Sequence, residues 1–122
     1  MSYPNDRKYT EDHEWITSDS PARVGITEFA ANALDEAVYI DLPDVGDEVT
    51  AGEACGEIES VKSVSDLVAP ASGTVTAINE EAVDDPKKVT DDPHSTWLYE
   101  VEVSQLPDLL DAQAYEAIAK EQ

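Results

Sequence analysis

An excess of acidic side chains is the strongest constraint that this sequence places on its own folding. The 122 residues contain 28 Asp and Glu but only 7 Lys and Arg, which gives a formal net charge of −21. Self-repulsion of this size opposes a compact state, and Leu, Ile, Val and Phe supply only 26 residues for a core. A stable fold therefore requires that these few apolar residues be buried together.

Three interpretations of this charge are open. The chain could be a disordered acidic protein, a folded mimic of nucleic acid that binds a basic partner, or a folded, halophilic protein from a cell with molar internal salt. We favour the third, because molar salt shortens the Debye length to roughly 3 Å and removes most of the self-repulsion. Val-rich segments with turn signals separate the acids and argue against disorder. Direct binding to nucleic acid is not expected, because the chain has no basic patch.

The hydrophobic pattern predicts a mainly β chain. Residues 1–8 are expected to form a flexible N-terminal tail, and residues 9–122 a single domain. The expected strands cover residues 13–17, 23–26, 38–42 and 97–103, with short β segments over 48–78 and a loop region over 84–93. Alternation in the last strand places Tyr99 and Val101 on one face and Leu98 on the other. Strands spaced about ten residues apart indicate a barrel or a sandwich.

Two helices complete the expected fold. The first is short and internal, with Thr27 as its N-cap and an end near Asp35. The second covers residues 107–122 at the C-terminus, where apolar residues form one stripe. Asp108 or Asp111 is expected to cap it.

Conventional catalytic and metal-binding patterns do not occur in the sequence. One cysteine, Cys55, excludes an internal disulfide and is expected to be a small buried hydrophobe. Two separated histidines do not make a structural zinc site. No apolar segment approaches the ~20 residues that span a bilayer, and no secretory signal is expected, because the first residues are polar. A cytoplasmic, non-catalytic protein without a metal is the expectation.

Lys62 stands out against this acidic background. Between Val24 and Pro86 there are 15 acids and this one base. Apolar and polar residues alternate on both sides of it, which predicts that it lies at the tip of a hairpin. An isolated amine at such a tip is accessible to a modifying enzyme. The alternative is an ordinary surface lysine paired with Glu59 or Asp66.

The segment around Lys62 resembles the lipoyl-lysine segment of glycine cleavage H proteins. In that family Glu-Ser-Val-Lys is followed three residues later by Ser-Asp, and here residues 59–62 and 65–66 supply the pattern. The similarity continues in order from Tyr9 to Glu116. It is carried by His13-Glu14-Trp15, residues 24–28, Asp41-Leu42-Pro43, Val45-Gly46, Ala69-Pro70 with Ser72-Gly73, Trp97, Leu109-Leu110-Asp111 and Tyr115-Glu116. The chain departs from the family at Asp35, where Gly is usual, and at Ser95-Thr96, where Gly-Gly is common.

The resemblance implies a lipoyl-domain-like fold, a flattened barrel-sandwich hybrid of two small antiparallel sheets with the lysine at a β-turn. It also implies a carrier with lipoate bound covalently to Lys62. Such a carrier takes the aminomethyl group of glycine from a decarboxylating P protein, which uses pyridoxal phosphate, to a T protein that uses tetrahydrofolate. Electrons then pass to the L protein, a dihydrolipoyl dehydrogenase. A lipoate ligase or octanoyltransferase attaches the arm, and the carrier is expected to be a monomer.

The resemblance also implies roles for individual residues. Asp12, Glu14 and Asp66 are expected to line a cleft that limits water and holds the ammonium of the loaded arm, although each could be a solvated acid. Glu59 and Gly73 are expected to serve recognition by the lipoylating enzyme, and Gly73 could equally be a structural turn residue.

Other functions remain open from the sequence. Within the family, the chain could be a relay that passes lipoyl groups to other complexes. A biotin carrier fits less well, because such carriers typically have Met on both sides of the lysine, where this chain has Val61 and Ser63. An unmodified acidic interaction protein is the alternative from a different class.

Overall fold

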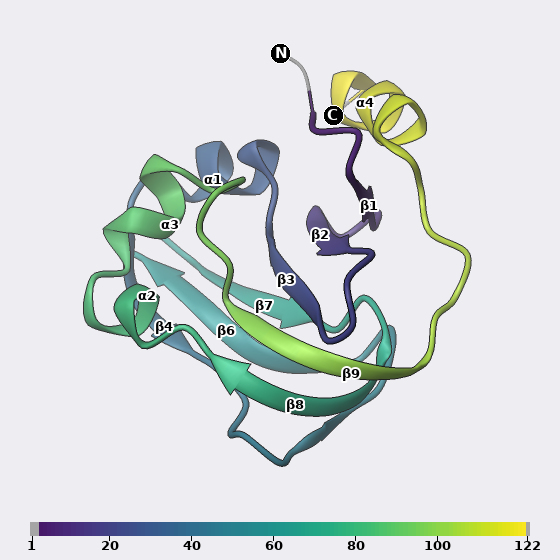
Figure 1. The fold of residues 1–122 in the computed structure, drawn as a ribbon. Helices are drawn as coiled ribbons and strands as arrows, with labels where there is room; N and C mark the ends of the chain where they lie inside the picture. Colours follow the sequence, from purple (N-terminus) through teal and green to yellow (C-terminus); the bar gives the residue numbers. More distant parts are fainter. Residues whose placement is uncertain (1–2, 122) are drawn as a thin grey trace.

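The computed structural model describes residues 3–121, with side chains as far as Ala119 (Figure 1). Its strands are β1 (Arg7–Tyr9), β2 (Glu14–Thr17), β3 (Ala22–Ile26), β4 (Ala37–Asp41), β5 (Glu48–Val49), β6 (Ala54–Ser60), β7 (Val64–Val68), β8 (Ser72–Ile78) and β9 (Tyr99–Gln105). Its helices are α1 (Glu28–Leu34), α2 (Glu80–Asp84), α3 (Lys87–Asp91) and α4 (Ala112–Glu121).

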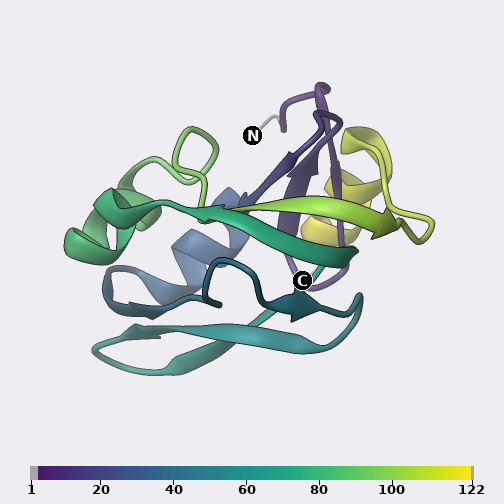
Figure 2. The same ribbon diagram turned by 60° about the horizontal axis from the view of Figure 1, so that its bottom comes forward.

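The strands form two antiparallel sheets. The larger has the order β1-β2-β3-β9-β8-β5 and the smaller the order β4-β6-β7. Figure 2 shows the hairpin of β6 and β7 as a layer below β8 and β9. Val24 and Tyr99 from the larger sheet and Ile58 and Leu67 from the smaller one belong to a single buried cluster. The expected mainly β fold of two small antiparallel sheets, with an internal and a C-terminal helix, is confirmed.

The internal helix forms for the reason that the sequence indicates. Thr27 is its N-cap, with Oγ1 accepting a hydrogen bond from the Ala30 N–H at 3.4 Å, and Glu28 is an acid in the first turn, where the helix dipole favours it. The helix ends at Asp35, which has a φ of +74°. Glycine adopts this left-handed backbone without a steric cost, which gives a physical reason for the Gly that the resemblance leads one to expect there.

Two expectations about helices are wrong. The region over 84–93, expected to be a loop, contains α3, whose Val89 is completely buried. The C-terminal helix begins at Ala112 instead of 107, because the backbone of Leu110 pairs with Tyr9 through hydrogen bonds of 2.8 and 2.9 Å. Asp111, one of the two expected caps, accepts a hydrogen bond from the Ala114 N–H at 2.8 Å.

The expected strand over 97–103 is also displaced. β9 begins at Tyr99, and Leu98, which alternation assigns to the face opposite Tyr99, is completely buried like its neighbour. The Leu98 N–H donates to the Val24 carbonyl, and its own carbonyl accepts from Asn79. Leu98 is therefore hydrogen-bonded to two different segments just before β9 begins. It does not follow the alternation of side chains that applies within a regular strand.

Part of the segment expected to be a flexible tail is packed. Tyr3 is 6 % exposed, and its ring meets the rings of Tyr9 and Tyr115 edge-on. Arg7 and Lys8 pair with β2. The apolar ring of Tyr3 thus joins a second buried cluster, between β1 and α4, close to both ends of the chain (Figure 1). Residues 1 and 2 lie outside the described part.

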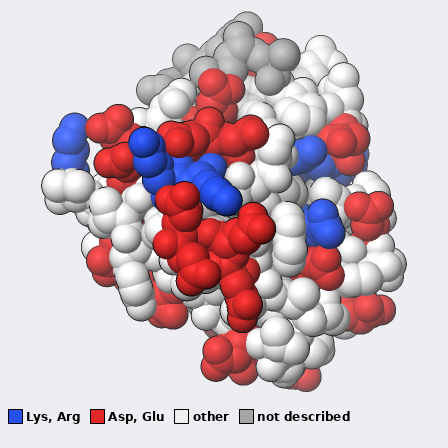
Figure 3. Space-filling view, turned by 60° about the vertical axis from the view of Figure 1, so that its left-hand side comes forward, with Lys and Arg blue, Asp and Glu red and all other residues white. Residues whose placement is uncertain are grey.

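On the face of the molecule drawn in Figure 3, acidic side chains cover more of the surface than basic ones do. The described residues make four ion pairs within 4 Å, each with at least one half-exposed partner. Most of the 28 acids therefore have no salt-bridge partner among these residues. None of the described helices has the length and apolarity that a bilayer-spanning segment requires.

Candidate functional site

Lys62 lies at the tip of the hairpin that joins β6 to β7. Glu59 pairs with Val64, and the Ser60 N–H donates to the Ser63 carbonyl at 2.8 Å, which leaves Val61, Lys62 and Ser63 as the turn. The Ser60 Oγ accepts hydrogen bonds from the N–H groups of Lys62 and Ser63 at 3.2 and 3.1 Å. A largely buried serine therefore fixes the backbone of the exposed tip.

The Lys62 side chain is exposed. Among the described residues it forms no ion pair within 4 Å, so the pairing with Glu59 or Asp66 is not formed. Two apolar neighbours are also exposed, Val61 at 83 % and Val64 at 56 %. The tip thus presents an unpaired amine between two valines.

A cleft of about 340 Å³ lies against the same hairpin, and Ile58 and Ser65 are its lining residues nearest to the tip in sequence. One wall is the hairpin, through Ile58, Ser65 and Asp66, and the facing wall includes Phe29 and Ala33 of α1. The remaining lining residues are Asp12, His13, Glu14, Ile26, Ala30, Leu34, Leu67 and Val68. The structure therefore brings together Asp12, Glu14 and Asp66, the three acids expected to share a cleft.

The three acids differ sharply in their surroundings. Asp12 and Asp66 are exposed at the cleft, whereas Glu14 is only 2 % exposed. Its Oε2 accepts a hydrogen bond from the Val68 N–H at 2.6 Å, and its Oε1 has no hydrogen-bond partner among the described residues. Burial, opposed by this hydrogen bond and assisted by the charge of Asp12, raises the pKa of Glu14 from 4.5 to about 9. Glu14 therefore lines the cleft as a buried acid, and its Oε1 has neither a hydrogen-bond partner among the described residues nor contact with solvent.

The two residues expected to serve enzyme recognition lie elsewhere. Glu59 is half-buried in β6, opposite Tyr39 and Val64 and close to the tip. Gly73 belongs to the other sheet, where a Cβ would collide with the Glu102 carbonyl oxygen. Close packing against β9 is therefore a sufficient reason for a glycine at position 73.

Sequence reasoning did not single out Ser60 or His13 as parts of the site. The spacing of Ser60 and Ser63 is a signal for a serine-stabilised turn, so the first could have been found. His13 lines the cleft with its ring stacked on Phe29 at 4.2 Å, and no local pattern indicates this contact. Cys55 is partly buried, its Sγ donates to the Tyr99 hydroxyl at 3.6 Å, and burial raises the pKa of its thiol.

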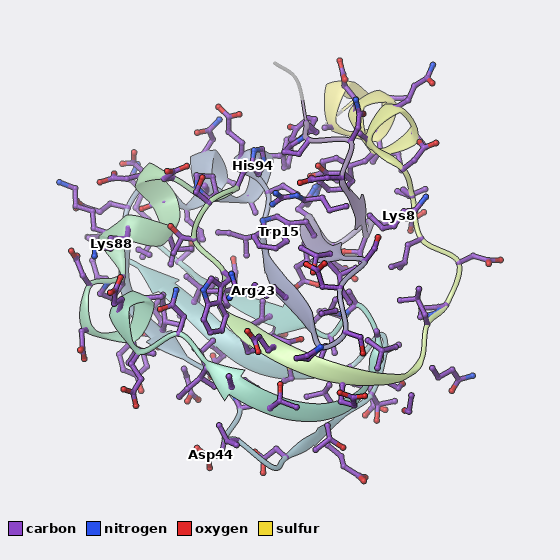
Figure 4. All side chains as sticks on the ribbon, viewed as in Figure 1. Lys8, Trp15, Arg23, Asp44, Lys88 and His94 are labelled. Atoms are coloured by element: carbon purple, nitrogen blue, oxygen red, sulfur yellow. The ribbon has the colours of Figure 1, made fainter. Side chains whose placement is uncertain are left out.

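A larger hollow of about 460 Å³ lies between α2 and the start of β9. Several of its polar groups pair with one another: Lys88 pairs with Glu81 at 3.5 Å, and the Asn79 Nδ2 donates to the Trp97 carbonyl at 2.8 Å. Arg23 is labelled in Figure 4, and its guanidinium lies 4.9 Å from the centroid of the Trp97 ring. With no orphaned buried group, this hollow is a weaker candidate than the cleft beside Lys62.

Two small antiparallel sheets packed face to face, with one exposed lysine at a hairpin tip, define a barrel-sandwich domain of the biotinyl and lipoyl carrier class. Comparisons with known proteins narrow this class. The family model described as glycine cleavage H-protein matches residues 7–122. The chain belongs to this family of lipoyl carriers in glycine cleavage.

Individual relatives agree over nearly the whole chain. The chain is 55 % identical over 120 residues to a glycine cleavage system H protein from Beutenbergia cavernae, and the aligned residues make up 97 % of each chain. It is 50 % identical over 123 residues to the one from Streptomyces coelicolor, covering 98 % of each. The crystal structure of a glycine cleavage system H protein from Mycobacterium marinum matches with a TM-score of 0.90 at 47 % identity, over 94 % of this chain and 97 % of the other.

Proposed function

We propose that this chain is the lipoyl carrier of a glycine cleavage system, with lipoate joined through an amide to the Nζ of Lys62. The observation that carries the proposal is the unpaired, exposed Lys62 at a serine-fixed hairpin tip, on the same hairpin that lines a cleft with three acids. These residues suit the group, because the amine is exposed for acylation and the cleft is lined by the exposed acids Asp12 and Asp66 together with Glu14.

The bound lipoyl group supplies a sulfur that carries the aminomethyl unit of glycine and a disulfide–dithiol couple that carries electrons. The chain supplies position and protection. The hairpin restricts where Lys62 can present its substituent, which raises the effective concentration of the cargo at each partner. Phe29, Ala33 and Ile58 give the cleft apolar walls that exclude water. Asp12, Glu14 and Asp66 supply negative charge for the ammonium of the cargo.

The proposed partners follow from this role. They are the P protein with its pyridoxal phosphate, the T protein with its tetrahydrofolate, and the L protein, a dihydrolipoyl dehydrogenase. A lipoate ligase or octanoyltransferase modifies Lys62, guided by Glu59 and Gly73. We place the chain in the cytoplasm as a monomer that catalyses no step itself.

The other candidates have less support. Relay of lipoyl groups to other complexes would use the same lysine, and no feature of the described residues favours it over glycine cleavage. An unmodified acidic interaction protein would not need a buried acid with a free oxygen beside its hairpin.

A reconstituted glycine cleavage system tests the proposal. The chain is lipoylated, mixed with the P, T and L proteins, and glycine-dependent release of CO2 is followed. Lys62→Arg should fold normally and abolish this release. Lys88→Arg is the matched control, because Lys88 is an exposed lysine on α3 and pairs with Glu81; it should retain full activity. Retained activity of Lys62→Arg would contradict the proposed function.

A further inference from the structure

A row of three side chains crosses the outer face of the smaller sheet next to Lys62. Tyr39 of β4 lies opposite Glu59 of β6, and Glu59 lies opposite Val64 of β7. We infer that Tyr39 and Val64 are the apolar contacts through which the enzyme that acylates Lys62 binds this chain. The inference rests on the proposed function, and it adds two residues to the recognition that is proposed for Glu59 and Gly73.

The pairing of the strands puts this row on the outer face. Ile40 and Ile58, the next pair along β4 and β6, are buried in the cluster that joins the two sheets. Successive side chains of a strand point to opposite faces, so Tyr39 and Glu59 point away from that cluster. Side chains directly opposite on neighbouring strands have Cβ atoms about 5 Å apart. Glu59 therefore lies between a tyrosine and Val64, at the last paired position before the turn.

The two apolar members of the row are exposed on an acid-rich surface. Tyr39 is 53 % exposed and Val64 is 56 % exposed, although burial of such side chains would stabilise the fold. Eight large apolar side chains are exposed among the described residues, and four of them belong to β4 or to the hairpin that carries Lys62: Val38, Tyr39, Val61 and Val64. Apolar side chains that gather at one place on a charged surface are typical of a protein interface.

A second row, of acids, lies beside the first. Asp41, Glu57 and Asp66 are opposite one another on the same three strands, two residues farther from the tip, and all three are exposed. None of them forms an ion pair within 4 Å with a described lysine or arginine. A partner that fits both rows presents an apolar patch with basic side chains at its edge. In molar salt these charges attract only weakly, so the apolar contacts supply most of the affinity.

The position of the apolar row selects the acylating enzyme among the proposed partners. This enzyme forms the amide at the Nζ of Lys62, so its reacting group must reach the tip itself. The P, T and L proteins act on sulfur atoms at the far end of the arm and need not cover the sheet. Val64 is two residues from Lys62, and Tyr39 is in register with Val64 through Glu59. An enzyme bound at Nζ therefore covers the row.

Acylation of the unmodified chain by a lipoate ligase from the same cells tests the inference. The ligase consumes lipoate and ATP, forms the amide at Lys62 and releases AMP and pyrophosphate, and the mass of the intact chain gives the rate. Tyr39→Ser and Val64→Ser should each lower kcat/KM about tenfold or more. The loss should come mainly from a higher KM, because these contacts hold the chain without touching the reacting atoms. Tyr39→Phe keeps the ring and should restore the wild-type value.

The matched control is Val45→Ser, which removes a comparably exposed valine from the turn before β5 and should leave kcat/KM unchanged. Urea unfolding shows that each variant is folded. Tyr39→Ser that has been lipoylated by long incubation should release CO2 from glycine at the wild-type rate.

Three results would overturn the inference: equal kcat/KM for Tyr39→Ser and the wild type, an equal loss in Val45→Ser, or a larger loss in glycine cleavage than in acylation. A wild-type dimer that Tyr39→Ser converts to a monomer would also overturn it, because the row would then bind a second copy of the chain. A wild-type chain that the ligase leaves unmodified contradicts the proposed function instead, so the two failures are distinguishable.

Discussion

The hydroxyl of Tyr115 lies 2.6 Å from Nδ1 of His13, so that the C-terminal helix reaches a residue that lines the cleft. The same hydroxyl lies 2.7 Å from Oγ1 of Thr27, the N-cap of α1. The Tyr115 ring also stacks on Tyr9 at 5.0 Å. One buried tyrosine therefore connects α4, the start of α1 and one wall of the cleft.

This connection predicts the effect of Tyr115→Phe. The ring stacking should remain, but the buried hydroxyl of Thr27 and the His13 nitrogen lose a partner, which costs about 1–3 kcal/mol of unfolding free energy. Urea unfolding measures the loss. Tyr39→Phe is the matched control, because Tyr39 is 53 % exposed, and it should change stability by less than about 0.5 kcal/mol. Equal unfolding midpoints for Tyr115→Phe and the wild type would contradict the connection.

The raised pKa of Glu14 predicts a pH-dependent gain from Glu14→Gln. An acid whose pKa rises from 4.5 to about 9 on folding stabilises the fold fully below pH 4.5, and this contribution is lost as the pH rises towards 9. Glutamine does not titrate. The unfolding free energy of Glu14→Gln minus that of the wild type should therefore increase by about 1.4 kcal/mol per pH unit between pH 6 and 8. A difference that is constant over this range would show that Glu14 is not protonated in the fold.

The hairpin tip gives a third prediction. In Ser60→Ala the N–H groups of Lys62 and Ser63 lose their acceptor, so amide hydrogen exchange at both residues should accelerate, with a loss of stability of about 1 kcal/mol. Thr76→Ala changes an exposed hydroxyl on β8 and should leave exchange at the tip unaltered. Unchanged exchange at Lys62 and Ser63 in Ser60→Ala would mean that the serine does not fix the turn.

The net charge of −21 predicts that salt stabilises the fold. Lowering KCl from molar to tenths of molar lengthens the screening distance, so repulsion among the acids should lower the unfolding free energy. Thermal unfolding at neutral pH measures the trend. At pH 4, where many carboxyl groups are protonated, the dependence on KCl should be weaker. A midpoint that does not change with KCl would remove the high-salt interpretation of the composition.

Local features of the fold could be predicted from the sequence, and long-range ones could not. The Thr27 cap and the hairpin around Lys62 depend on neighbouring residues, and both are present. The start of α4 at Ala112 depends on the backbone pairing of Tyr9 with Leu110, about one hundred residues apart. The packing of Tyr3 depends on the same distant helix. No periodicity within a segment reports such contacts.

The candidate site shows the same difference between local features, which the sequence predicts, and long-range contacts, which it does not. From the sequence, each of the three cleft acids could be a solvated acid, which holds for Asp12 and Asp66 but not for Glu14. The burial of Glu14 results from the approach of β2 to β7, joined by its hydrogen bond to Val68 across 54 positions. Resemblance to a family grouped these three acids, whereas the residue pattern alone did not. The free oxygen of Glu14 is visible only in the structure.

Mass analysis of the peptide that contains Lys62 tests the central claim most directly. The protein is purified from its own cells during growth with active lipoylation, and the peptide is compared with one that contains Lys87 and Lys88. We expect Lys62 to carry the mass of a lipoyl or octanoyl group and the other two lysines to be unmodified. An unmodified Lys62 in all of the purified protein would contradict the carrier function.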